Sequence, residues 1–190
     1  MKVLVTGSNG FIAKNLICHL ESVPDIEILK FNKTHDDGVL YNLIDQASVI
    51  FHLAGANRPT HDGEFKSDNI DLTRKIVNRL KETSKKKKII FSSSTQSKEK
   101  NNYGKSKAES EILLRKLSKK KNLTIVIYRL TNVFGKWSRP NYNSVVATFC
   151  FNILNSKKIE INDPETVLKL IYIDDLAENF MRQVSIPLDQ

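Results

Sequence analysis

Short, nearly continuous apolar runs alternate with longer segments of helical periodicity along almost the whole chain. The apolar runs are KVLVTG, IEILKF, SVIFHLAG, KKIIFSSS and LTIVIYRL. Strands of a parallel sheet have this composition because helices cover both faces of the sheet and bury both sets of side chains. Repeated strand–helix–strand units therefore predict a doubly wound α/β fold with a parallel sheet, as one domain over residues 1–190.

The spacing of apolar residues also predicts where the helices lie. It indicates helices near residues 11–22, 67–82, 103–119 and 142–156, and a last helix with Asp174 as its N-cap after the strand LKLIYI. Segment 32–47, between the second and third strands, is brief for a full helix. We therefore expect a shortened crossover there.

The chain is basic, with 30 lysines and arginines against 21 acidic residues and a formal net charge of +9. Much of the excess lies in two lysine runs, 85–88 and 119–121, each placed where a helix would end and a strand begin. Cations at such positions favour the helix C-terminus and stay solvated. Because no aromatic residues alternate with them to stack on bases, the pattern argues against a nucleic-acid partner.

Other features bear on the compartment. No stretch approaches the ~20 apolar residues of a membrane span, and MKVLVTGSNG runs into glycines without a signal-peptide cleavage site. Cys18 and Cys150 are the only cysteines, too few for a disulfide framework or a thiolate metal site. We expect a cytoplasmic protein that binds no metal and no membrane.

The segment TGSNGFIA follows the first strand and opens the first helix. Glycines suit the tight turn and the close approach of the backbone to a pyrophosphate, and Ala13 permits close packing of helix on sheet. The free N–H groups at the helix start then face the phosphates. The pattern predicts a dinucleotide site in this loop. Its residues are Gly7, Ser8, Asn9, Gly10, Phe11 and Ile12.

The end of the second strand bears on which dinucleotide binds. An acidic residue there would bind the ribose hydroxyls of the adenosine and favour NAD, but the sequence has Asn32 and Lys33. A cation suits the additional 2′-phosphate, so we expect NADPH. The alternative is that Lys33 is one more solvated lysine.

The segment YGKSK places Tyr103 one helical turn before Lys107, and a serine run, 92–94, ends the fourth strand. Residues four apart share a helix face, so the phenol and the ammonium point into one site. A phenol with an ordinary pKa of ~10 is a slow acid–base group at neutral pH, and a nearby ammonium lowers that pKa. This arrangement suits reduction of a ketone, with Tyr103 as the proton donor. The alternative is a tyrosine at a helix start beside a solvated lysine.

The segments TGSNGFIAKNL, HLAGANRP, SSS and YGKSK, in this order, resemble the extended short-chain dehydrogenase/reductases that act on nucleotide sugars. The resemblance implies a Rossmann-like fold and a catalytic trio of Ser94, Tyr103 and Lys107. It implies that Asn69 helps to order a proton-relay water, and that a homodimer forms through the helices near 103–119 and 142–156. The residues implied along the adenosine side of the cofactor are Leu53, Ala54 and Gly55.

The segments HLAGANRP, RLTNVFGKWSRPNYNSVVATFCFNI and YIDDLAENF are similar to a narrower family. These are the bacterial capsular polysaccharide reductases that make UDP-2-acetamido-2,6-dideoxy-β-L-talose, on the route to UDP-N-acetyl-L-fucosamine. The similarity implies NADPH-dependent reduction of the 4-keto group of a UDP-2-acetamido-2,6-dideoxy-hexulose.

Polar side chains cluster after the fifth strand, beside the expected site. Their donors suit a diphosphate sugar, and Trp137 and Tyr142 offer faces for uracil or a sugar ring; a packed loop is the alternative for Trp137. We interpret His52, which ends a buried strand, as a core histidine. The predicted substrate-binding residues are Arg58 (alternatively a loop cation), Asn132, Lys136, Arg139, Asn141 and Tyr142, with Arg129 and Asn143 as further donors.

Members of the narrower family continue into a lobe over the sugar and a metal-binding cupin domain that epimerises the sugar ring. We expect neither within residues 1–190, and hence no epimerisation of the ring by this chain. One alternative function is a nucleotide-sugar 4-epimerase or dehydratase of the same superfamily. Dehydratases usually have an acidic residue beside the catalytic hydroxyl, where this chain has Thr95 and Gln96. Another is a truncated, non-catalytic NADPH-binding module.

Overall fold

A computed structural model describes residues 1–57, 65–161 and 163–187. Five parallel strands form one sheet in the order β2-β1-β3-β4-β5. The predicted doubly wound parallel sheet is therefore confirmed. The strands are β1 (Lys2–Thr6), β2 (Glu27–Phe31), β3 (Val49–His52), β4 (Lys87–Ser94) and β5 (Leu123–Leu130).

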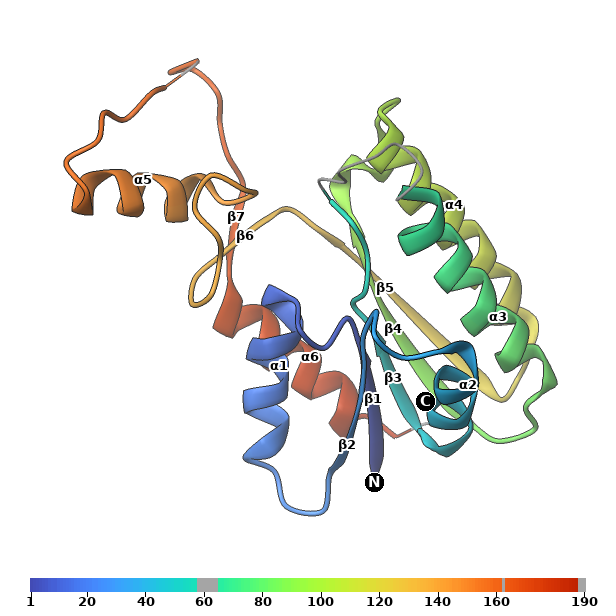
Figure 1. The fold of residues 1–190 in the computed structure, drawn as a ribbon. Helices are drawn as coiled ribbons and strands as arrows, with labels where there is room; N and C mark the ends of the chain where they lie inside the picture. Colours follow the sequence, from blue (N-terminus) through green and yellow to red (C-terminus); the bar gives the residue numbers. More distant parts are fainter. Residues whose placement is uncertain (58–64, 162, 188–190) are drawn as a thin grey trace.

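Helices cover both faces of this sheet (Figure 1). Alternate residues of a strand point to opposite faces, so Ile89 and Phe91 enter one apolar cluster while Ile90 enters the other. Strands buried on both sides need apolar residues at nearly every position, as the sequence has. One face carries α1 (Phe11–Glu21) and α6 (Ile173–Ser185), and the other carries α2 (Asp37–Gln46), α3 (Leu72–Glu82) and α4 (Asn102–Arg115).

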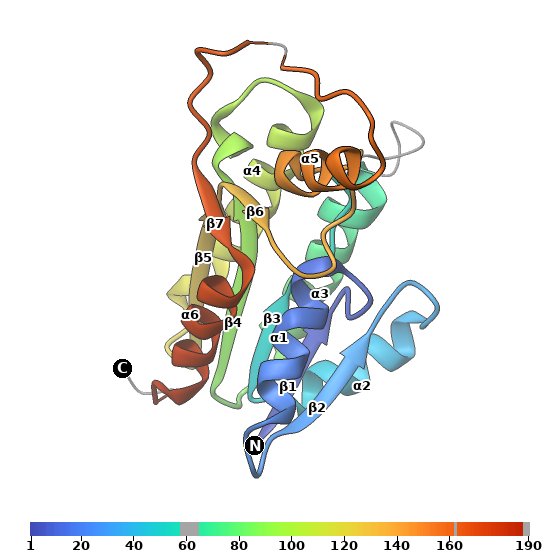
Figure 2. The same cartoon turned by 90° about the vertical axis from the view of Figure 1, so that its left-hand side faces the viewer.

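A smaller outer part follows β5. Strands β6 (Asn132–Phe134) and β7 (Leu170–Tyr172) pair in parallel as a separate two-stranded sheet. Figure 2 shows α5 (Val145–Leu154) beyond the carboxyl ends of the main strands. Within the described ranges, no helix is both long enough and apolar enough to cross a bilayer. Three short helices complete the fold: the π-helix η1 (Phe65–Asp71) and the 3₁₀ helices η2 (Thr95–Lys98) and η3 (Lys116–Lys119).

Some expected elements differ from the observed ones. Helix α2 has ten residues, close to the eleven of α1, so the prediction of a shortened crossover is wrong. The helix expected over 67–82 is divided into η1 and α3. Helix α6 has Tyr172 as its N-cap, so Asp174 is not the cap. Asp174 lies in the first turn instead, where a carboxylate still interacts favourably with the helix dipole.

The lysine run at the start of β4 is partly buried, contrary to the prediction that it stays solvated. Lys87 and Lys88 are 2% and 1% exposed. Their ammonium groups donate hydrogen bonds to carbonyl oxygens at the C-terminal ends of α2 and α6. Carbonyls at a helix end accept no hydrogen bond from their own helix, so they are available to an external donor. Each charge is thus paired with helix-end carbonyls rather than with water. The acceptors are Ile44, Asp45 and Ala47 for Lys87, and Gln183 and Ile186 for Lys88.

Candidate active site

The turn after β1 is built around a residue that must be glycine. Gly7 has a φ of +66°, and a Cβ at this position would lie 2.7 Å from the Cα of Ala54. The Gly10 N–H donates to the Gly7 carbonyl at 2.8 Å, which closes the turn. The backbone after β1 therefore passes directly against the loop after β3, at the carboxyl edge of the sheet.

The start of α1 offers unoccupied N–H donors. Its N-cap is Gly10, which has no side chain to accept from the first turn, and the first turn carries no acidic residue. Both features favour an external anion at the positive end of the helix dipole. The residues present therefore fit the pyrophosphate of a dinucleotide, as the sequence predicts.

The residues after β2 are engaged in local contacts. The Asn32 side chain accepts hydrogen bonds from the N–H and hydroxyl of Thr34, at 2.9 and 2.6 Å, so it shapes the turn. The Lys33 ammonium lies 2.5 Å from the carboxylate of Asp68 in η1. Because the Lys33 side chain is 77% exposed, this ion pair joins the two segments at the surface, where it competes with water and ions.

The loop after β3 is held close to the helical residues of the site. The Ala54 N–H donates to the Thr6 hydroxyl at 3.2 Å. A Cβ at Gly55 would lie 2.7 Å from Oδ1 of Asn69 and 3.1 Å from Nζ of Lys107. A side chain at residue 55 would thus displace both polar groups.

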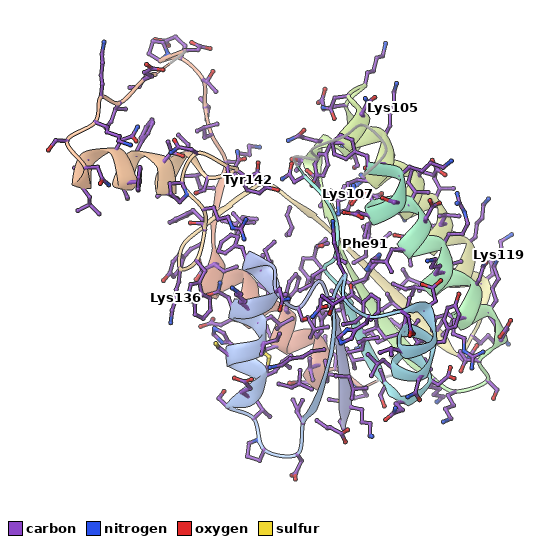
Figure 3. The ribbon with its side chains drawn as sticks, in the orientation of Figure 1. Phe91, Lys105, Lys107, Lys119, Lys136 and Tyr142 are labelled. Carbon is purple, nitrogen blue, oxygen red and sulfur yellow. The ribbon has the colours of Figure 1, made fainter. Side chains whose placement is uncertain are left out.

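The serine run, Tyr103 and Lys107 meet as the sequence predicts. The Tyr103 phenol lies close enough to the Ser94 side chain for that hydroxyl to lower the pKa of the phenol. The Lys107 ammonium, on a side chain that is 5% exposed overall, donates to the Ser92 carbonyl at 2.9 Å and lies 5.9 Å from the centre of the Tyr103 ring. Figure 3 shows Lys107 and Phe91 in the upper middle of the view, while Lys105 lies at the top, away from both.

The electrostatics of the pair differ from the sequence expectation. Burial raises the pKa of the Tyr103 phenol above its ordinary value of 10, although the nearby Ser94 side chain opposes this rise. Burial lowers the pKa of the Lys107 ammonium to about 8. The expected depression of the phenol pKa by Lys107 is therefore wrong for this structure, because the ammonium is bonded to Ser92 instead. The phenol stays protonated at neutral pH.

Asn69 is buried beside this group. Its side-chain N–H₂ donates to the Ser106 hydroxyl at 2.8 Å and to the Ala56 carbonyl at 3.1 Å, while its Oδ1 has no partner among the described residues. Buried acceptors in proteins nearly always have a partner or a bound water. The free Oδ1 lies against Gly55, as does the Lys107 ammonium, which suits a water shared by the two groups.

His52 is a core histidine, as predicted. Its two ring nitrogens lie 2.9 Å from the hydroxyls of Thr6 and Thr73, and its ring stacks on Phe91. Burial, with the charge of Lys107, lowers the pKa of His52 to about 3. Since the Thr73 hydroxyl also donates to the Asn69 carbonyl, the neutral ring is part of a polar chain from β1 to the segment carrying Asn69.

The predicted substrate-binding residues lie on the segment from β6 to α5, except Arg58, which is outside the described residues. Tyr142 lies near enough to Tyr103 to raise the pKa of its phenol, and Figure 3 shows Tyr142 on the side of the site opposite α4. The others have side chains at the surface and no contact to Tyr103 recorded in the described chain. They are Asn132, Lys136, Arg139 and Asn141.

The loop after β6 has an unusual backbone. Trp137 and Asn141 have φ of +68° and +55°, which side chains other than glycine seldom adopt. Trp137 is 44% exposed, and the Lys136 ammonium lies 4.4 Å from its ring centre. Buried Asn15 of α1 donates to the Lys136 carbonyl at 3.0 Å and fixes the loop to the helix. Trp137 therefore lies in a surface loop that is fixed to α1, and not in the core.

The sequence interpretation missed the structural roles of two polar side chains, Glu111 and Asn15. Arg129, taken as a substrate donor, is bonded instead to the buried carboxylate of Glu111. The four-residue spacing of Tyr103, Lys107 and Glu111 was a signal that Glu111 faces the sheet. Asn15 had a weaker signal, as a polar residue among the inward positions of an apolar helix face.

Comparison with known proteins gives the family. The model of the NAD dependent epimerase/dehydratase family matches residues 3–185. The chain belongs to this family. Within it, the extended short-chain reductases of nucleotide-sugar and capsule pathways are the relatives that the sequence motifs predicted, and that prediction is confirmed.

One curated relative in this epimerase/dehydratase family is the UDP-2-acetamido-2,6-beta-L-arabino-hexul-4-ose reductase of Pseudomonas aeruginosa. It is 44% identical over 182 residues, which are 96% of this chain and 49% of the relative. The crystal structure of the capsular polysaccharide assembling protein CapF from Staphylococcus aureus has a TM-score of 0.84 at 36% identity. It covers 97% of this chain and 49% of that one. The chain thus spans about half the length of these relatives.

A more distantly similar solved structure shares the fold. The UDP-glucuronic acid 4-epimerase from Bacillus cereus, crystallised with UDP-glucuronic acid and NAD, has a TM-score of 0.85 at 20% identity. It covers 98% of this chain and 74% of its own. At this identity the likeness concerns the fold alone.

Proposed function

We propose that this chain carries an NADPH-dependent reductase site for the 4-keto group of a UDP-2-acetamido-2,6-dideoxy-hexulose. The observation that carries the proposal is the Tyr103 phenol beside Ser94 and the buried Lys107, at the same carboxyl edge of the sheet as the glycine turn after β1. The relative from Pseudomonas aeruginosa, named as a hexul-4-ose reductase, supports the substrate class.

In the proposed reaction, Tyr103 is the general acid. Bound NADPH supplies hydride to the carbonyl carbon, so the carbonyl oxygen must receive a proton. Tyr103 donates it, and burial keeps the phenol protonated until then. Positioned acids of this kind contribute about 10²- to 10⁴-fold to rate. Ser94, whose side chain lies beside the phenol, would hold the carbonyl oxygen within reach of that proton.

The phenolate left on Tyr103 must be reprotonated. The buried Lys107 ammonium lies 5.9 Å from the centre of the Tyr103 ring, so one water could link the two groups. A water that donates a hydrogen bond to Oδ1 of Asn69 and accepts one from Lys107 would pass a proton from solvent into the site. The unpartnered state of that Oδ1 supports this role for Asn69.

The dinucleotide would bind along the carboxyl edge of β1, β2 and β3. The uncapped start of α1 would hold its pyrophosphate, and the segment Leu53–Gly55 would line its adenosine side. Lys33 would leave Asp68 and pair with a 2′-phosphate. This pairing would favour NADPH over NADH, because NADH lacks that phosphate. Tyr142 and the polar residues after β6 would contact the UDP-sugar.

The test is turnover with a defined substrate. The purified chain is mixed with NADPH and a UDP-2-acetamido-2,6-dideoxy-4-keto-hexose, and nicotinamide oxidation is followed by absorbance while the sugar is analysed by NMR. We expect stoichiometric formation of the 4-hydroxy sugar. Binding of NADPH without oxidation would instead favour a non-catalytic module, and interconversion of UDP-sugars without net oxidation would favour an epimerase. Light scattering tests the proposed homodimer.

A further inference from the structure

Residues of α4 at four-residue spacing contact the serine run 92–94 at the end of β4. The phenol of Tyr103 lies beside the side chain of the third serine. The ammonium of Lys107 donates to the carbonyl of the first serine at 2.9 Å, and the hydroxyl of the second donates to the carboxylate of Glu111 at 2.6 Å. Helix and strand are therefore joined by three successive polar contacts along one helix face.

Of the three contacts, the one at Glu111 is furthest along α4 from Tyr103, and its carboxylate accepts further hydrogen bonds. Glu111 is 3% exposed, and its two oxygens accept from Nε and Nη2 of Arg129 at 2.9 and 2.7 Å. Arg129 on β5 is the register partner of Ser93 on β4. One carboxylate thus binds both members of a cross-strand pair, which ties α4 to two strands at once.

This carboxylate is charged under all ordinary conditions. Burial raises the pKa of Glu111, but the bonds from Arg129 and Ser93 outweigh burial and lower it to about 2. Charge-assisted, two-pronged arginine–carboxylate contacts are strong and also directional. Glu111 therefore stays ionised near neutral pH, and it attaches α4 rigidly to the two strands.

We propose that Glu111 is a positioning residue, which fixes the place of α4 along β4 and thereby holds the Tyr103 phenol at Ser94. The reason is geometric: α4 is one continuous helix, so a shift at Glu111 moves Tyr103 by the same amount. A slip of one residue is a translation of about 1.5 Å. Misplacement of a reacting group by about 1 Å costs on the order of 100-fold in rate.

The kinetic consequence rests on the proposed function, but the geometric claim has a readout of its own. Burial raises the phenol pKa and the nearby Ser94 side chain lowers it, so a displaced α4 shifts the titration of Tyr103. This titration is followed by ultraviolet difference absorbance, with Tyr103→Phe in each background as the blank. It requires neither sugar nor turnover.

The experiment compares Glu111→Gln with Arg115→Met. Arg115 also faces Glu111, but at 3.7 Å and with a side chain 61% exposed, so it serves as the matched control. In Glu111→Gln we expect kcat to fall about 10- to 100-fold with KM within about twofold, and the Tyr103 titration to differ from that of the wild type. Arg115→Met should match the wild type in both measurements.

A folded Glu111→Gln variant with wild-type titration and kcat would overturn the inference. If that variant does not fold, Ser93→Ala replaces it, because this change keeps the ion pair and removes only the bond to β4. A wild-type titration in Ser93→Ala would likewise refute the positioning role. If the wild type never reduces a 4-keto sugar, the proposed function fails, while the titration still decides the role of Glu111.

Discussion

The Lys107 ammonium donates its hydrogen bond to the Ser92 carbonyl, 2.9 Å away, and not to the Tyr103 phenol. The lysine is thereby held in the floor of the site, with its charge beside the ring of the tyrosine. This arrangement leaves the phenol protonated, which is the state a proton donor needs. It also makes the roles of the two residues separable by mutation.

Tyr103→Phe removes the proposed acid and keeps the ring. We expect kcat for ketone reduction to fall about 10²- to 10⁴-fold, the usual contribution of a general acid. Affinity for NADPH, measured by nicotinamide fluorescence, should change less than about twofold, because the change keeps the ring and leaves the glycine turn after β1 intact. Turnover that survives the change would disprove the assignment of the acid.

Lys33→Ala tests the cofactor preference. Loss of a charge-assisted bond to the 2′-phosphate should weaken NADPH binding about tenfold, with NADH affinity unchanged. Asp68→Asn is the complementary variant, since it frees Lys33 from its ion pair and should tighten NADPH binding. Both are measured by fluorescence titration at fixed salt. Tighter binding of NADH than of NADPH by the wild type would contradict the prediction.

Gly7→Ala tests the turn after β1. A left-handed residue with a Cβ costs about 1–2 kcal/mol, and this Cβ would also meet the backbone of Ala54 at 2.7 Å. We expect a lower free energy of unfolding in urea and weakened dinucleotide binding. Gly38→Ala is the control. Gly38 lies in the first turn of α2, and a Cβ there would meet only a side-chain oxygen of Asp36, the N-cap residue. Equal effects of the two changes would refute the assignment.

Acid should destabilise the protein through His52. The folded ring has a pKa of about 3 and the ordinary value is 6.5, so between these values the unfolded chain binds the extra proton. Stability is therefore complete above pH 6.5 and falls as the pH drops toward 3, by at most about 5 kcal/mol. Melting temperatures against pH check this fall. In His52→Asn the slope between pH 6.5 and 4.5 should largely disappear.

The sequence by itself determined the doubly wound sheet, the glycine turn and the meeting of Tyr103 with Lys107. Each of these depends on residues a few positions apart: the apolar runs, the residues after one strand, and a four-residue spacing on one helix. Such patterns act through the local backbone, so they can be read without knowing the neighbours in space.

The tertiary structure alone decided how the charges are used. Lys87 and Lys88 belong to a lysine run that looks solvated, yet carbonyl groups at two distant helix ends accept their hydrogen bonds. Arg129 looked like a substrate donor until Glu111 was seen to bind it. Burial of a charge is tolerable only beside its partner, and those partners come from residues 18 to 98 positions away. Their pairing is a property of the packed fold.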